Sequence, residues 1–207
     1  MPFCFSDQEN TMSRHALHHL PGIVPFAHSL LRQALQAGDQ ALDATAGNGH
    51  DTVLLAQLVG DSGHVHAFDI QPAALQATRQ RLHDAQLASR VTLVNDSHAN
   101  IRQHVAPGLK AAIFNLGYLP GGDKSLATHA DSTVQALDAA LALLQPGGVL
   151  VVVVYPGHAG GEAERMAVED WFAALNPTEA LAARYQLVNQ PHAPPLVLAL
   201  EKRPKCV

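Results

Sequence analysis

The sequence is poor in cysteine, in long apolar runs and in charged side chains. Its two cysteines, Cys4 and Cys206, lie near opposite ends of the 207 residues, which excludes a disulfide framework and a cysteine-rich zinc cluster. The longest apolar run, residues 149–155, is far shorter than the ~20 residues of a membrane-spanning helix. The polar first residues carry no signal-peptide pattern. We therefore expect a cytoplasmic protein without a membrane partner.

The charge balance limits the classes of partner. Charged residues make up 15% and apolar residues 47% of the chain, so it is too apolar to be disordered throughout. The net charge is −5 with histidine neutral, which argues against a broad, non-specific nucleic-acid surface. A local basic patch stays compatible with these numbers, and thirteen histidines change charge near neutral pH.

Short apolar runs alternate with amphipathic stretches, the pattern of an α/β fold. The runs predict strands over residues 40–45, 64–68, 91–94, 111–115, 149–155, 184–189 and 196–201. The stretches between them predict helices over residues 23–36, 51–59, 72–85, 99–105, 131–144 and 162–175. We expect a mostly parallel seven-stranded sheet with helices on both faces. It forms a single domain over residues 14–207, after a loose segment 1–13. Ligands in such folds bind beyond the carboxyl ends of the strands.

The loop after the first predicted strand has the composition of a cofactor site. It reads DATAGNGHDT over residues 43–52, with Gly47 and Gly49 allowing a sharp turn before a helix. Asp69 ends the second strand, where a carboxylate can accept hydrogen bonds from ribose hydroxyls. The third glycine of a dinucleotide fingerprint is replaced by Thr52, and the acidic Asp43 suits a cation better than a pyrophosphate. S-adenosylmethionine, which carries an amine, a carboxylate and a sulfonium, fits this loop.

Each cofactor group can be given a partner. Asp43 would hold the amine, directly or through water, and the amides around Gly47 and Gly49 would receive the carboxylate. Asp96 and Ser97, after the third strand, would reach the adenine amino group. The alternative is purely structural, with Asp43 and Asp51 capping the turn and the helix, and Asp69 an ordinary polar strand end.

The loop after the fourth strand, FNLGYLPGGDK over residues 114–124, carries the expected chemistry. Asn115-Leu116-Gly117-Tyr118 is similar to the Asn/Asp-Pro-Pro-aromatic loop of amino-directed methyltransferases. The Asn115 side-chain oxygen and the Leu116 carbonyl can accept two amine hydrogens and aim the nitrogen lone pair. Tyr118 can stack on a flat base. The alternative is a surface loop whose glycines only make turns.

Further polar residues near these strand ends have weaker assignments. Asp123 is a candidate acceptor of the released proton, Lys124 can meet a phosphate, and His158 can line the substrate pocket or only pack. His28 precedes the first strand and reads as a packed histidine or as a cover for the cofactor. The role of three leader histidines stays open, and no metal site is expected: His15, His18 and His19.

Taken together, these stretches resemble one bacterial family, the tRNA 5-aminomethyl-2-thiouridine methyltransferases, earlier described as rRNA methylases. The matching text is DATAGNGHDT, FDIQ at 68–71, DSH at 96–98, FNLGYLPGGDK and YPGH-GG at 155–161. The resemblance implies a Rossmann-like class I methyltransferase fold and S-adenosylmethionine as cofactor. It assigns these residues to the cofactor: Asp43, Gly47, Asn48, Gly49, Asp51, Thr52, Asp69, Gln71, Asp96, Ser97, His98, Asn115 and Gly117. It assigns catalysis to Asn115, Tyr118 and Asp123, and substrate contacts to Tyr118, Lys124 and His158.

The same resemblance implies a reaction. It is transfer of a methyl group to the aminomethyl nitrogen of 5-aminomethyl-(2-thio)uridine at the wobble position, so the anticodon region of tRNA is the expected partner. The alternatives are a methyltransferase acting on rRNA or on a small amine, and a non-catalytic module that binds S-adenosylmethionine and regulates a partner. The sequence carries no argument for or against a homodimer.

Overall fold

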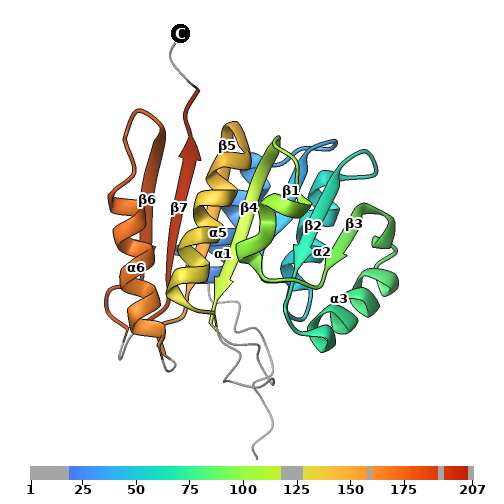
Figure 1. Ribbon diagram of the computed structural model, residues 1–207, viewed down its shortest axis with the longest axis horizontal. Coiled ribbons are helices and arrows are strands. Elements are labelled where there is room, and N and C mark those ends of the chain that lie inside the picture. The colour runs from blue at the N-terminus through green and yellow to red at the C-terminus, as the bar shows by residue number, and fades with distance from the viewer. Residues whose placement is uncertain (1–18, 118–127, 158–159, 191–193, 205–207) are drawn as a thin grey trace, which may run out of the picture.

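The computed structural model describes residues 19–117, 128–157, 160–190 and 194–204. Within these residues, seven strands form one sheet in the order β3-β2-β1-β4-β5-β7-β6 (Figure 1). Their bounds are β1 (Gln40–Asp43), β2 (His64–Phe68), β3 (Val91–Val94), β4 (Leu109–Leu116), β5 (Leu144–Val154), β6 (Ala180–Gln186) and β7 (Leu196–Lys202). Strands β1 to β5 pair in parallel, and β7 runs antiparallel to both β5 and β6. The predicted, mostly parallel, seven-stranded sheet is confirmed.

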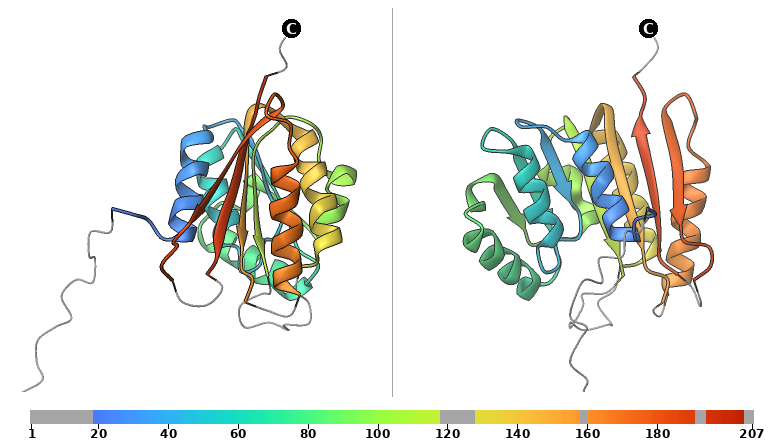
Figure 2. Two further views of the ribbon diagram at one scale, coloured as in Figure 1. Left: turned by 90° about the vertical axis from the view of Figure 1, so that its left-hand side faces the viewer. Right: turned by 180° about the vertical axis from the view of Figure 1, so that it is seen from behind.

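Helices cover both faces of the sheet (Figures 1 and 2). One apolar layer contains α1 (Ile23–Ala34), α2 (His50–Val59) and α3 (Pro72–Asp84), and the other contains α4 (Ile101–His104), α5 (Ala130–Leu143) and α6 (Gly161–Ala173). Along β5, Val151 and Val153 pack into the first layer, whereas Leu150 and Val152 pack into the second. Because both faces of this strand are buried, its sequence shows no alternation with polar residues.

Most element boundaries lie within two residues of the sequence prediction, and three elements differ more. The helix expected over residues 99–105 is a 3-10 turn, His98–Asn100, followed by the single turn of α4. Strand β5 begins at Leu144 rather than 149, because a register shift against β4 lets the turn at Gly147 (φ +72°) stay within the strand. Strand β6 spans Ala180–Gln186 rather than 184–189. It lies at the sheet edge, where side chains such as Leu181 are exposed and no buried alternation marks the strand.

The strand order reverses between β1 and β4, which opens a crevice at their carboxyl ends. In the register of these two strands Asp43 lies opposite Ile113, so Asn115 extends two residues beyond the tip of β1. The residues that the sequence singled out after separate strands therefore meet at one edge of the sheet. No helix in the described ranges is long and apolar enough to cross a membrane.

Candidate active site

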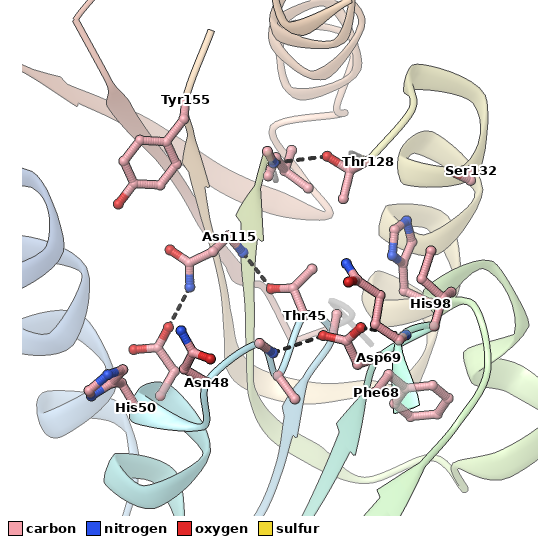
Figure 3. A pocket seen from close by; sticks show the side chains of 18 of the residues that line it. Thr45, Asn48, His50, Phe68, Asp69, His98, Asn115, Thr128, Ser132 and Tyr155 are labelled. Carbon is pink, nitrogen blue, oxygen red and sulfur yellow. Dashed lines mark hydrogen bonds between the residues drawn. The ribbon is translucent and has the colours of Figure 1, made fainter. Parts of the chain in front are cut away.

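A cavity of about 1160 Å³ lies at the carboxyl ends of the parallel strands (Figure 3). Its walls come from the loop after β1 and from the ends of β2, β3, β4 and β5, together with the start of α5. Small-molecule pockets usually enclose ~300–1,000 Å³, so this cavity can hold a cofactor and part of a second molecule. The lining includes most of the predicted site residues: Gly47, Asn48, Asp51, Asp69, Gln71, Asp96, Ser97, His98, Asn115 and Gly117.

The two glycine amides of the β1 loop form hydrogen bonds within the protein. The Gly47 N–H donates to Asp69 Oδ2 at 2.9 Å, and the Gly49 N–H donates to the Ala46 carbonyl at 2.8 Å. These amides hold the turn and tie it to the tip of β2. That the amides around Gly47 and Gly49 receive the methionyl carboxylate of the cofactor stays a prediction.

Asp43, Gly49 and Thr52 lie behind the cavity wall rather than on it. Asp43 is fully buried, and it accepts hydrogen bonds from the Thr45 N–H at 3.1 Å and from Thr52 Oγ1 at 2.6 Å. Burial, together with the negative charge of Asp51, raises the pKa of Asp43 to about 7. Asp43 thus supports the loop from beneath, and its predicted hold on the cofactor amine, directly or through water, stays a prediction.

Asp69 and Asp96 do line the cavity, and both are held by local hydrogen bonds. Asp69 Oδ1 accepts the Gln71 N–H at 2.8 Å, and burial raises the pKa of this carboxyl. Asp96 accepts hydrogen bonds from Asn100 Nδ2 at 2.8 Å and His104 Nε2 at 2.9 Å, which lower its pKa. A carboxylate oxygen has further lone pairs, so both residues retain capacity toward a ligand.

His98 is a buried imidazole in the same wall. It is 8% exposed, and burial lowers its pKa to about 4, so the ring is neutral at physiological pH. Its Nε2 atom has no hydrogen-bond partner within the described part of the chain. A buried polar atom without a partner is costly. This atom is therefore suited to a ligand group that can donate to it or accept from it.

Asn115 is held by two neighbours on the β1–α2 segment, one through its backbone and one through its side chain. Its backbone N–H donates to Thr45 Oγ1 at 2.7 Å, and its Nδ2 donates to Asp51 Oδ2 (dashed in Figure 3). Asp51 Oδ1 in turn accepts from His28 Nε2 at 2.6 Å. Because an ionised carboxylate can only accept, the amide nitrogen of Asn115 must face Asp51. The amide oxygen is then the end that is available to a ligand.

The base of the loop after β4 is closed by a second buried carboxylate. Thr128 donates its backbone N–H to the Gly117 carbonyl at 3.0 Å, and its Oγ1 accepts the Gly117 N–H at 2.9 Å. The same hydroxyl donates to Glu164 Oε2 at 2.7 Å, and Thr133 Oγ1 donates to Glu164 Oε1 at 2.6 Å. Glu164 on α6, only 1% exposed, thus anchors the two ends of the loop that carries the predicted chemistry.

Several lining residues were missed or left without a role by the sequence reasoning. Tyr155 stands on the side of the cavity opposite Thr45 and faces Asn115, and burial with the nearby Asp51 charge raises its pKa. It directly follows β5, so the strand-end rule that selected Asn115 also applies to it. The others in this group are Thr45, His50, Thr128, His129 and Ser132. His28, which the sequence offered as a packed histidine or a cover for the cofactor, also lines the cavity. Four predicted residues lie outside the described ranges: Tyr118, Asp123, Lys124 and His158.

The charge of the cavity wall favours a cation. Asp51, Asp69 and Asp96 line it, Asp43 lies directly behind it, and no lysine or arginine is among the described residues that line it. A phosphate-bearing cofactor would meet repulsion here, whereas a sulfonium and an amine would be attracted. This donor set, the unpartnered imidazole of His98 and the cavity volume fit S-adenosylmethionine.

Comparisons with known proteins agree with this chemistry. The family model described as "Putative rRNA methylase" matches residues 65–201. The chain belongs to this family. A second model, of protein-L-isoaspartate(D-aspartate) O-methyltransferases, matches residues 2–112. A chloroplastic tRNA (mnm(5)s(2)U34)-methyltransferase from Arabidopsis thaliana is 38% identical over 187 residues, which are 85% of this chain and 68% of the relative.

Solved structures of family members extend the agreement to the fold. A protein from Clostridium thermocellum with the same family description superposes with a TM-score of 0.88 at 38% identity, covering 89% of this chain and 100% of the other. A methyltransferase from Streptococcus mutans, crystallised with SAH, gives a TM-score of 0.82 at 36% identity, covering 88% and 99%. The family member described here is an S-adenosylmethionine-dependent methyltransferase with the Rossmann-like fold. When bound, the cofactor supplies an electrophilic methyl group attached to a sulfonium.

Gly49 provides a test of how tightly the β1 loop is built. Its φ is +80°, and a Cβ added there would lie 2.9 Å from the backbone Cα of Thr78. We expect Gly49→Ala to lower the free energy of unfolding by about 2 kcal/mol or more, since strain and overlap add. Urea unfolding monitored by circular dichroism measures this. Gly157→Ala is the matched control because an added Cβ there meets no atom within 4 Å; equal losses in both variants would contradict the argument.

The raised pKa of Asp43 predicts a pH dependence of stability. A carboxyl that binds its proton more tightly in the folded state contributes stability below the unfolded pKa of 3.8, and this contribution is lost as pH rises through about 7. We expect Asp43→Asn, which keeps the shape and a hydrogen bond to Thr45, to lose less stability than the wild type between about pH 5 and about pH 8. Urea unfolding at both pH values provides the comparison, and parallel losses would refute this role for Asp43.

Proposed function

We propose that this enzyme transfers a methyl group to the aminomethyl nitrogen of 5-aminomethyl-2-thiouridine at the wobble position of tRNA. The Arabidopsis relative, whose name specifies a modified uridine at position 34 of tRNA, supports this choice of substrate. The observation that carries the amine chemistry is the fixed orientation of the Asn115 side chain. The remaining support comes from the charge of the cavity and from its volume.

The orientation of Asn115 matches what an amine requires. Its amide nitrogen is bound to Asp51, so Oδ1 is the end that can accept a hydrogen bond from an amine. An amine that donates one hydrogen to Oδ1 and a second to the Leu116 carbonyl has its lone pair directed away from both. Holding two reactants in such alignment contributes several kcal/mol, or about 7–11 in well-oriented cases. In this proposal catalysis consists mainly of placement.

Methylation of a small amine by the same site is the second candidate. The net charge of −5 favours it over a nucleic-acid substrate. The two candidates differ in their salt dependence, because a protein that contacts several phosphates loses affinity steeply as salt rises. Binding of an anticodon stem-loop measured at low and high salt therefore separates them.

Mass spectrometry of tRNA nucleosides tests the proposed reaction. Purified enzyme and S-adenosylmethionine are incubated with tRNA that contains 5-aminomethyl-2-thiouridine, and the nucleosides are then separated. We expect this nucleoside to be replaced by its methylaminomethyl form, heavier by one methylene. Unmodified tRNA and rRNA serve as controls. If calorimetry demonstrates cofactor binding but no tRNA nucleoside gains mass, the tRNA proposal fails, and methylation of small amines in the same assay would favour the second candidate.

The role of Asn115 is tested separately from cofactor binding. We expect Asn115→Ala to reduce kcat by about 100-fold or more, since it removes the acceptor that aligns the amine. The Kd for S-adenosylmethionine, measured by calorimetry, should change by no more than about threefold. Asn176→Ala, in an exposed turn before β6, is the matched control. Equal losses in kcat and in cofactor affinity would instead make Asn115 a cofactor ligand.

A further inference from the structure

We propose that His28 and Asp51 act as a pair that accepts the proton which the substrate ammonium must lose before methyl transfer. This inference rests on the proposed amine substrate and extends it to a proton acceptor within the described residues. Neither residue was expected to carry this role, because His28 lies within the helix before β1 and Asp51 reads from the sequence as a cofactor ligand or a helix cap. The fold brings both side chains to the cavity wall beside Asn115.

The chemistry of the substrate creates the need for an acceptor. An aliphatic amine has a pKa near that of lysine, about 10.4, and so arrives as an ammonium without a lone pair. One N–H bond must break, with its electron pair remaining on nitrogen and its proton passing to the enzyme. The neutral nitrogen then forms the new N–C bond, while the electron pair of the broken C–S bond goes to sulfur. The product is a secondary ammonium, so this step itself releases no second proton.

The position of Asp51 meets this need. Its Oδ2 atom accepts from Asn115 Nδ2, so the carboxylate is one hydrogen bond away from the group that would orient the amine. Its Oδ1 atom lies 2.6 Å from His28 Nε2, which donates to the ionised carboxylate in one tautomer and can accept the proton of the protonated carboxyl in the other. The Asp51 side chain is 15% exposed and that of His28 is 25% exposed. The carboxylate is thus nearly enclosed, and the imidazole provides a more open route for the proton toward solvent.

The charges around Asp51 are consistent with a carboxylate that attracts a cation. Asp43 on β1 lies close enough to Asp51 for the two charges to repel, and Tyr155 after β5 faces the same carboxylate. No lysine or arginine among the described lining residues neutralises Asp51, so the imidazole of His28 is the ionisable side chain paired with it there. Asp51 also lies in the first turn of α2, where the helix N-terminus stabilises a negative charge.

A purely structural reading of the pair is that it ties α1 to α2. The core already provides that tie: Ala27 and Leu31 of α1 pack in one apolar cluster with Leu54 and Leu55 of α2. A hydrogen bond exposed to the cavity adds little to such packing. The structural reading also predicts no dependence of activity on pH beyond that of the whole enzyme, so the two readings give different experimental outcomes.

The test is the pH dependence of single-turnover methylation by His28→Gln and Asp51→Asn on the aminomethyl tRNA. Both replacements retain hydrogen-bonding capacity but remove the proton acceptor or its charge. We expect about a 100-fold loss of rate near neutral pH. The loss should shrink by about tenfold or more toward pH 9.5, since the amine itself then supplies more of its neutral form. His83→Gln is the matched control, because His83 forms a similar pair with Asp84 on the exposed surface of α3.

Three results would overturn the proposal. A deficit that stays constant with pH would leave the pair only a structural role, and a wild-type rate in His28→Gln would remove the imidazole from the reaction. Loss of S-adenosylmethionine binding by calorimetry in both variants would assign the pair to the cofactor. Should Asp51→Asn fail to fold, His28→Gln alone decides. Absence of methylation by the wild-type enzyme itself would refute the proposed substrate, which is a separate failure.

Discussion

The double attachment of Asn115 to the β1–α2 segment is the interaction on which the site depends. Its backbone N–H binds Thr45 Oγ1, and its side chain binds Asp51, so the tip of β4 is locked to the loop that follows β1. These two strands flank the point where the strand order reverses, which is where a crevice opens in this class of sheet. One residue therefore fixes the distance between the part of the cavity beside the β1 loop and the part beside the tip of β4.

Burying carboxylates near the cavity costs desolvation free energy, and nearby hydrogen-bond donors offset part of this cost. Asp43 is fully buried near Asp51, and its pKa rises to about 7 for that reason. The Thr52 hydroxyl and the Thr45 backbone N–H each donate a hydrogen bond to Asp43, which compensates part of its desolvation penalty. A similar solution recurs at the base of the next loop, where Thr128 and Thr133 satisfy the buried Glu164. In both places threonine hydroxyls let a carboxylate organise a loop without a basic partner.

The sequence predicted the parts of this site that follow from one rule, namely that function lies directly after parallel strands. Asp69, Asp96 and Asn115 were found in this way, and the boundaries of β2 and β3 were predicted without error. The contacts that the sequence did not predict depend on which atoms of distant segments meet in the folded chain. The occupation of the Gly47 and Gly49 amides, and the link between Thr128 and Glu164, join residues whose spacing carries no periodic signal. Strand β6 was misplaced because an edge strand buries too little to show a pattern.

Under the proposed function, one cavity must hold two cations: the sulfonium of the cofactor and the ammonium of the substrate. The carboxylates of the wall attract both, but at short separation the two positive charges repel each other in a site that excludes water. Loss of a proton from the ammonium removes this repulsion and exposes the nitrogen lone pair in a single event. A carboxylate beside the orienting amide, backed by an imidazole that reaches solvent, is the arrangement that this coupling requires. The link from Asn115 through Asp51 to His28 therefore joins placement of the amine to its activation.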